Sequence, residues 1–213
     1  MNRAGNPFRE RLELRLRDAG LTLTLQVGEF ESLERYYKLL SRWNRRINLT
    51  SLSLPDFPAA TLDRLLVEPL AAASLLEDLP LCWFDLGSGG GSPAIPLKVV
   101  RPAVHLTMIE SSSKKTAFLR EAVHLVGLPD ALVLDARVET LAQRIRAKTV
   151  DIVTVRAVRI DEDLIATVTH LLGIGGRLLL FGSDAESAAP GFRIDEIRKL
   201  PGDGGNLSIL QRV

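Results

Sequence analysis

The feature that most constrains the fold is an apolar segment that runs directly into a glycine loop, Trp83-Phe84-Asp85-Leu86-Gly87-Ser88-Gly89-Gly90-Gly91-Ser92-Pro93. Because glycine has no Cβ, a ligand can come close to its backbone, and the unpaired N–H groups that open a following helix point at that ligand. The loop holds more glycines than a turn alone requires. The stretch therefore predicts a buried strand, a loop that binds a nucleotide-type ligand, and a helix.

The glycine spacing and one acid narrow the choice of ligand. Dinucleotide enzymes favour G-x-G-x-x-G; the frame that begins at Gly87 fails at Ser92, and the frame from Gly89 passes only with the permitted final alanine. Asp85 would repel a pyrophosphate, but it can meet a cationic amino-acid group or fix the loop. The loop thus favours S-adenosylmethionine, and a dinucleotide-dependent oxidoreductase is the less favoured alternative.

From residue 81 onward, short apolar strands alternate with helices. We expect strands at 81–86, 104–110, 131–134, 150–155 and 176–182, and helices near 93–100, 113–126, 137–146 and 161–172. Such alternation is typical of a parallel sheet covered on both faces. Residues 192–200 and 207–213 flank a glycine-rich turn and predict an antiparallel hairpin, which brings the sheet to seven strands.

The N-terminal part has a different pattern. Residues 1–78 predict a helical extension, with helices at 7–19, 29–47 and 61–76, the last kinked at Pro69, ahead of an α/β core at 79–213. Residues 1–50 hold ten Lys or Arg against six Asp or Glu, whereas the remainder holds seventeen against twenty. A basic arc on helix 29–47 includes Arg42, Arg45 and Arg46, which we expect to contact the phosphates of a polyanion; an ordinary solvated face is an equal alternative.

Ligands of such sheets bind at the carboxyl ends of the strands. Glu110 ends the second expected strand and suits the hydroxyls of a ribose, and with Asp85, Gly87 and Gly89 it is a candidate for cofactor binding. Arg156 ends the fourth expected strand, where a plain ion pair is the alternative role. Glu139 follows the third and can address an adenine, or merely compensate a helix N-terminus.

Other classes of protein are not indicated. One cysteine, Cys82, and three scattered histidines give neither a disulfide framework nor metal-ligand spacing, so we expect no metal. No apolar run is long enough to span a membrane and the N-terminus lacks a signal-peptide pattern, so we expect a cytoplasmic protein without a membrane partner.

Six short motifs lie along most of the chain: Trp43-Asn44-Arg45-Arg46-Ile47-Asn48-Leu49-Thr50, Asp85-Leu86-Gly87-Ser88-Gly89-Gly90-Gly91, Ile95-Pro96-Leu97, Lys114-Lys115 with Phe118-Leu119, Arg137-Val138-Glu139 and Arg156-Ala157-Val158. Their combination resembles the glucose-inhibited division protein B family of small-subunit ribosomal RNA guanine-N7 methyltransferases. The resemblance implies a class I methyltransferase fold, Rossmann-like, with S-adenosylmethionine as cofactor. It also implies a cofactor pocket formed by Gly87, Ser92, Val138, Glu139 and Arg156.

The chain departs from that family at a few positions. Ala60 and Arg64 flank Asp63 where the family usually has a histidine and a serine, Ser92-Pro93-Ala94 replaces Phe-Pro-Gly, and Phe181 replaces a lysine ahead of a glycine. These departures concern the RNA target more than the cofactor.

The resemblance implies methyl transfer to N7 of a guanine in 16S ribosomal RNA, with that RNA or the small ribosomal subunit as partner. Guanine N7 carries a lone pair and no proton, so the reaction needs no general base. We expect Arg156 to position the base or to hold the cofactor. A diverged, weakly catalytic relative that binds S-adenosylmethionine or RNA is the alternative.

Overall fold

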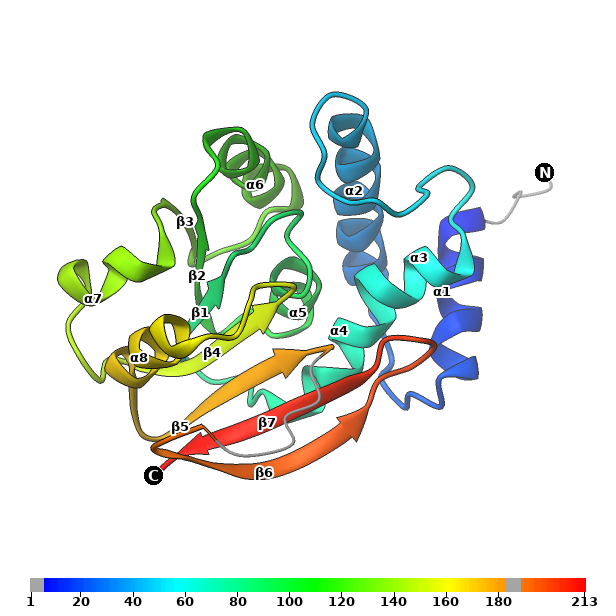
Figure 1. The fold of residues 1–213 in the computed structure, drawn as a ribbon. Helices are drawn as coiled ribbons and strands as arrows, with labels where there is room; N and C mark the ends of the chain where they lie inside the picture. The colour runs from blue at the N-terminus through cyan, green and yellow to red at the C-terminus, as the bar shows by residue number, and fades with distance from the viewer. Residues whose placement is uncertain (1–5, 183–188) are drawn as a thin grey trace, which may run out of the picture.

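A computed structural model describes residues 6–182 and 189–213 of the chain. The N-terminal part is helical, and Figure 1 shows its helices gathered on one side of the sheet. It consists of α1 (Pro7–Asp18), α2 (Val27–Asn44), α3 (Ala59–Leu62), the π-helical turn η1 (Asp63–Val67), α4 (Glu68–Ala71) and the 3-10 turn η2 (Ala72–Leu75). The expected helical character of this part is confirmed.

Strands and helices alternate in the remainder, as predicted. They are β1 (Cys82–Leu86), α5 (Ala94–Val100), β2 (His105–Glu110), α6 (Ser113–Val126), β3 (Ala131–Asp135), η3 (Val138–Thr140), α7 (Leu141–Arg144), β4 (Val150–Arg156), α8 (Glu162–Leu171), β5 (Leu172–Phe181), β6 (Phe192–Lys199) and β7 (Asn206–Arg212). Within the described residues one seven-stranded sheet forms, in the order β3-β2-β1-β4-β5-β7-β6. Strands β1 to β5 pair in parallel, and β7 runs antiparallel between β5 and β6.

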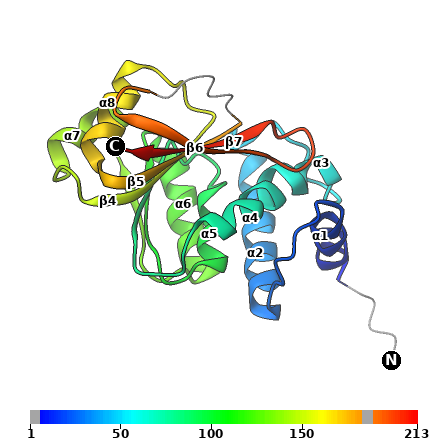
Figure 2. The ribbon, with the colours of Figure 1, turned by 90° about the horizontal axis from the view of Figure 1, so that it is seen from below.

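The sheet separates two hydrophobic clusters. One cluster joins α5 and α6 to the N-terminal helices and includes Trp83 and Ile152 on the sheet. The other packs α7 and α8 against the opposite face through Leu141, Leu164 and Val168. Figure 2 shows the two groups of helices on opposite sides of the strands. Since α1 and α2 belong to the first cluster, they share a core with the sheet.

Helix α2 ends three residues earlier than the sequence predicts. The Asn44 side chain accepts hydrogen bonds from the backbone N–H groups of Leu49 (2.8 Å) and Thr50 (3.0 Å). Its Nδ2 donates to the Thr50 carbonyl at 3.0 Å. Such local side-chain bonds compete with helical ones. They close residues 45–50 into a loop instead of a further helical turn.

The third N-terminal helix is also more irregular than predicted, although Pro69 does mark the break. Proline has no N–H, so the carbonyl of Leu65, four residues earlier, lacks its helical donor. The turn before it widens, with the Glu68 N–H donating to the Asp63 carbonyl. The hydroxyl of Ser92 then donates to the Leu65 carbonyl at 2.9 Å. The carbonyl that the widened turn leaves free thus accepts a hydrogen bond from the residue that follows the glycine loop.

Two further boundaries differ from the prediction. The expected helix 137–146 is reduced to η3 and the single turn α7. Strand β5 begins at Leu172 and not at 176, because an irregular pairing with β4 accommodates the glycines at 173, 175 and 176. Neither difference moves the carboxyl edge of the sheet.

The buried hydroxyl of Tyr36, on α2, donates to the Gly90 carbonyl in the glycine loop at 2.7 Å. Its neighbour Tyr37 donates instead to the Leu54 carbonyl at 2.9 Å. Both tyrosines belong to the same hydrophobic cluster, but of the two only Tyr36 bonds to the glycine loop.

We expect Tyr36→Phe to lower the free energy of unfolding by about 1–3 kcal/mol, because it leaves a carbonyl without its donor. Urea unfolding measures this loss, and Tyr37→Phe is the matched control with a similar expected loss. Hydrogen exchange separates the two variants: only Tyr36→Phe should speed exchange of the Gly91 amide. Equal exchange in both variants would show that Tyr36 does not hold the loop.

Candidate functional site

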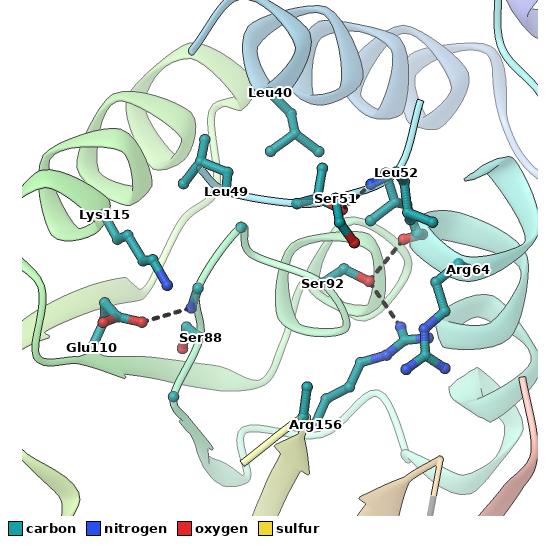
Figure 3. A pocket seen from close by; sticks show the side chains of 16 residues that line it. Leu40, Leu49, Ser51, Leu52, Arg64, Ser88, Ser92, Glu110, Lys115 and Arg156 are labelled. Carbon is teal, nitrogen blue, oxygen red and sulfur yellow. Dashed lines mark hydrogen bonds between the residues drawn. The ribbon is translucent and has the colours of Figure 1, made fainter. Parts of the chain in front are cut away.

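A cavity of about 360 Å³ lies at the carboxyl ends of β1, β2 and β4. Figure 3 shows the glycine loop at its centre, the segment that follows α2 across it, and two arginines at one end. Its lining residues are Leu40, Leu49, Thr50, Ser51, Leu52, Arg64, Leu65, Gly87, Ser88, Gly89, Gly90, Ser92, Glu110, Lys115, Arg156 and Ala157. We call it the central cavity.

The glycine loop (residues 87–91) has a backbone that other residues adopt poorly. Gly87, Gly89 and Gly91 have φ values of 72°, 53° and 85°. A Cβ on Gly87 would overlap the Cγ2 atom of Val158, whereas a Cβ on Gly89 would meet only the Gly87 carbonyl at 3.7 Å. Gly87 therefore serves the packing of the loop as well as the cavity, and a bulky substitution there disturbs the fold before it can report on a ligand.

Glu110, at the end of β2, organises one wall of the central cavity. Its carboxylate accepts hydrogen bonds from the backbone N–H groups of Gly89 and Ser112, both at 2.9 Å. A carboxylate offers about four acceptor sites, so two remain for a ligand that carries hydroxyl groups. Lys115 extends from α6 into the same region (Figure 3).

Asp85 lies beneath the loop and does not line the central cavity. Trp83 Nε1 donates to Thr154 Oγ1 at 2.9 Å, and that hydroxyl donates to Asp85 Oδ1 at 2.5 Å. Among the described residues no group donates to the other oxygen, Oδ2, which is buried. Of the two roles that the sequence leaves open for Asp85, the bond from Thr154 suits fixing the loop, and the unpartnered Oδ2 is compatible with a cationic amino-acid group above it.

A cluster of three charges, two of them buried, closes the other end of the cavity. Arg156 makes an ion pair with Glu68 of α4, which is 2% exposed, and donates to Ser92 Oγ at 3.1 Å. Its guanidinium lies 5.6 Å from the centre of the Phe181 ring. Arg64 pairs with the same carboxylate at 3.0 Å. These contacts fix a cationic guanidinium at the cavity wall (Figure 3).

Burial perturbs the charged groups of this region. It raises the pKa of Glu68, although Arg156 and Arg64 oppose that rise. Burial likewise lowers the pKa of Arg156 to about 10, with Glu68 acting against it. Arg156 therefore still carries its charge at neutral pH.

The central cavity brings together most of the cofactor residues that the sequence predicts. Gly87, Gly89, Ser92, Glu110 and Arg156 line it. Val138 and Glu139 lie in η3, outside the lining residues, and Glu139 is exposed. The assignment of Val138 rests on the resemblance alone, and that of Glu139 rests on the resemblance and on its place after β3.

Several cavity residues are absent from the sequence-based candidates. Leu49 and Thr50 belong to one of the family motifs, but they follow the expected helix 29–47 and no local pattern predicts their position over the glycine loop. Lys115 lies in another family motif, which by itself assigns it no role. Arg64 is a departure from the family, and the only signal in the sequence is its charge among the acids Asp63 and Glu68.

The basic arc of α2 is partly neutralised. The arc consists of five exposed cations on α2 and just beyond its end, Arg35, Lys38, Arg42, Arg45 and Arg46. However, Lys38 pairs with Glu34 at 2.7 Å, and Arg42 pairs with Glu121 of α6. Within the described part of the chain, Arg45 and Arg46 have no acidic partner within ion-pair distance. The two arginines follow the end of α2, beside the loop that crosses the cavity.

The departures at positions 64 and 181 are connected. Phe181 occupies the position of the family's lysine and places its ring beside Arg156. A Cβ on the next residue, Gly182, would lie 3.5 Å from the Arg64 guanidinium. Arg64 therefore lies next to the position that follows Phe181. Of the other departures, Ala60 is exposed and Ala94 is fully buried.

None of the helices in residues 6–182 or 189–213 is long and apolar enough to cross a membrane. The same ranges contain no group of three or more His, Cys, Asp or Glu side chains placed to hold a metal ion.

The sequence matches the model of one protein family, described as rRNA small subunit methyltransferase G, over residues 29–189. A curated relative named Ribosomal RNA small subunit methyltransferase G, from Chloroflexus aggregans, is 35% identical over 158 residues, which cover 74% of this chain and 65% of that protein. A relative of the same name from Xanthomonas axonopodis pv. citri is 36% identical over 175 residues, which cover 79% of this chain and 78% of that protein. The chain spans slightly under two thirds of the length of the first of these relatives.

Solved structures are similar in fold. A SAM dependent methyltransferase from Aquifex aeolicus aligns with a TM-score of 0.57 at 13% identity, covering 81% of this chain and 97% of that one. TrmN from Thermus thermophilus aligns with a TM-score of 0.58 at 19% identity, covering 82% of this chain and 52% of that one. The expected fold class, a Rossmann-like methyltransferase core with helices at its N-terminus, is confirmed.

The buried carboxyl of Asp85 gives a test by pH. Burial raises the pKa of Asp85 from an ordinary 3.8 to about 6, against the hydrogen bond from Thr154. The unfolded chain therefore loses this proton at lower pH than the folded chain does. The contribution of Asp85 to stability is full below about pH 4 and is lost as the pH rises to about 6, a change of about 3 kcal/mol.

We expect Asp85→Asn to remove this dependence, because the amide stays neutral and its oxygen can still accept from Thr154. The free energy of unfolding of the variant should exceed that of the wild type by up to about 3 kcal/mol at pH 8 and should equal it at pH 4. Urea unfolding at both values measures the difference. Asp85→Ala is the control and should be less stable at pH 4, since it removes the acceptor. If the difference in free energy of unfolding between Asp85→Asn and the wild type were the same at pH 4 and pH 8, the raised pKa of Asp85 would be contradicted.

Proposed function

The chain belongs to the rRNA small subunit methyltransferase G family, and on this premise we propose that it transfers a methyl group from S-adenosylmethionine to N7 of a guanine in 16S ribosomal RNA. One observation carries the proposal. The glycine loop and Glu110, from two neighbouring parallel strands, line one cavity with the fixed cation Arg156. We propose the small-subunit RNA, free or assembled, as the partner, and the cytoplasm as its location.

The residues present fit the proposed cofactor. Glycines at 89 and 90 leave the backbone open to the cavity, and Glu110 keeps free acceptor sites for ribose hydroxyls. The buried Asp85 Oδ2 lacks a donor among the described residues, as expected beneath a site for a cationic amino-acid group. We therefore propose that Asp85, Gly87, Gly89, Ser92, Glu110 and Arg156 hold the cofactor, with Val138 and Glu139 at its adenine. When bound, the cofactor supplies an electrophilic methyl group.

The chain's own task is then to position the guanine. N7 offers a lone pair without a proton, and none of the histidines lines the central cavity. N7 is difficult to reach in duplex RNA, where the major groove is deep and narrow, so the base must be unpaired or splayed. Arg156 can donate to guanine O6 or to a phosphate from a guanidinium that Glu68 and Ser92 already hold.

We further propose that residues 1–78 and residues 79–213 have different roles. The first part would face RNA through Arg42, Arg45 and Arg46, and the second would hold the cofactor. Arg45 and Arg46 follow the end of α2 and lead into residues 49–52, which line the central cavity. A phosphate backbone bound at these arginines would therefore pass close to the site of transfer.

Tritium transfer tests the proposed activity. Labelled S-adenosylmethionine should label small subunits, or their RNA, from cells that lack the modification, and the label should map to N7 of a guanine. Binding without transfer would identify a weakly catalytic relative. Thermal protection by NAD but not by S-adenosylmethionine would point to an oxidoreductase.

We expect Glu110→Ala to weaken S-adenosylmethionine binding by about 10- to 100-fold, because a charged acceptor of ribose hydroxyls is lost. Isothermal titration measures the dissociation constant. Glu110→Gln, which keeps an acceptor for the Gly89 N–H, should lose less. Asp195→Ala, on the exposed strand β6, is the control and should bind as the wild type does. Unchanged affinity in Glu110→Ala would remove this residue from the site.

The single-turnover rate should be nearly constant between about pH 6.5 and 8.5. Arg156 keeps its proton in that range because its pKa is about 10, and Asp85 titrates below it, at about 6. Arg156→Ala should lower the rate at least about tenfold and leave the profile flat, because it removes a positioning group and introduces no titratable side chain. A steep rise with a side-chain-like pKa inside the window would indicate a general base and an acceptor other than N7.

A further inference from the structure

A groove lies between α2 and α6, beside the central cavity. It has a volume of about 570 Å³ and is lined by Arg42, Trp43, Arg46, Ile47, Lys114 and Glu121. We call it the α2–α6 groove. Its lining combines the apolar surfaces of Trp43 and Ile47 with four charged side chains.

The indole of Trp43 is held in place within this groove. Its Nε1 donates to Glu121 at 2.9 Å, and its ring meets the ring of Phe118 edge-on at 6.0 Å between centroids. Because its polar edge is occupied, Trp43 presents apolar ring surface to the groove. A fixed ring of this kind is a platform on which a nucleobase can stack.

Two cations at the groove are available to an anion. Glu121 neutralises Arg42, but neither Arg46 nor Lys114 lies within ion-pair distance of an acid in the described ranges. Lys114 lies in the first turn of α6, which contains no acid. A cation there opposes the helix dipole, whereas an anion is attracted to both the dipole and the lysine. This arrangement is suited to a phosphate.

The groove continues into the central cavity. Lys114 lines the groove and Lys115, its neighbour, lines the cavity. On the opposite side, Ile47 lines the groove and Leu49 lines the cavity. A single-stranded nucleic acid bound in the groove can therefore continue into the central cavity, past Lys114 and Lys115 on one side and past Ile47 and Leu49 on the other.

We propose that the α2–α6 groove binds a base of single-stranded RNA, next in the strand to the nucleotide that enters the central cavity. The base stacks on Trp43, and Arg46 and Lys114 contact the adjoining phosphates. Charge complementarity selects this occupant, since two unpaired cations flank an aromatic platform. The inference rests on the proposed function and specifies where the substrate strand lies.

The test uses a short single-stranded RNA oligomer and the full-length protein, with binding followed by fluorescence anisotropy. Trp43→Ala should weaken binding about 5- to 100-fold, the effect of losing one stacked base, while Trp43→Phe should stay close to wild type. Lys114→Ala and Arg46→Ala should each reduce the slope of log affinity against log salt by somewhat less than one unit. Arg193→Ala, on the exposed strand β6, is the matched control and should change neither quantity.

Two readouts do not depend on how well a variant folds. The wild type contains two tryptophans, and Trp83 is fully buried, so quenching of emission by the oligomer reports on Trp43. An abasic oligomer of equal length should bind more weakly than the base-bearing one and should not quench. Equal affinity and equal quenching with both oligomers would overturn the proposal.

The outcomes separate this inference from the proposed activity. If Trp43→Ala bound the oligomer as tightly as wild type while the wild type methylated RNA, the groove proposal alone would fail. If stacking were observed without methyl transfer, the groove proposal would stand and the proposed activity would fail. If Trp43→Ala bound assembled subunits weakly but oligomers normally, the groove would hold a protein segment and the proposal would be wrong.

Discussion

The arrangement of the site depends on the buried ion pair between Arg156 and Glu68. It joins the carboxyl end of β4 to the N-terminal helices, so neither part completes the cavity without the other. Burying two charges is costly unless further groups satisfy them. Ser92, Arg64 and the Phe181 ring supply those groups. Position 204 must also remain glycine, because a Cβ there would overlap the Glu68 carboxylate.

The glycine loop is held from the N-terminal side by two further contacts. Pro69 leaves the Leu65 carbonyl without its helical donor, and the Ser92 hydroxyl takes that place. Tyr36 donates to the carbonyl of Gly90 from the other direction. A loop rich in glycine is flexible unless it is anchored. The helices of residues 7–75 therefore do more than provide a charged surface, since they set the shape of the loop.

Two of the departures from the family meet at one end of the cavity. The Phe181 ring lies beside the Arg156 guanidinium, and the Arg64 guanidinium lies close to Gly182. With Glu68 between two arginines, the cluster carries a net positive charge beside the cavity. Such a charge attracts a phosphate or a carbonyl oxygen of a base. The substitutions are thus compatible with the proposed RNA substrate.

Local periodicity and the backbone freedom of glycine predict the alternation of strands and helices, the glycine loop and the strand-end positions of Glu110 and Arg156. Three features could not be predicted in this way: Asp85 lies beneath the loop, residues 49–52 cross the cavity, and Glu121 neutralises Arg42. Each of them depends on contacts between residues far apart in the chain. Neither hydrophobic periodicity nor local spacing carries information on such contacts.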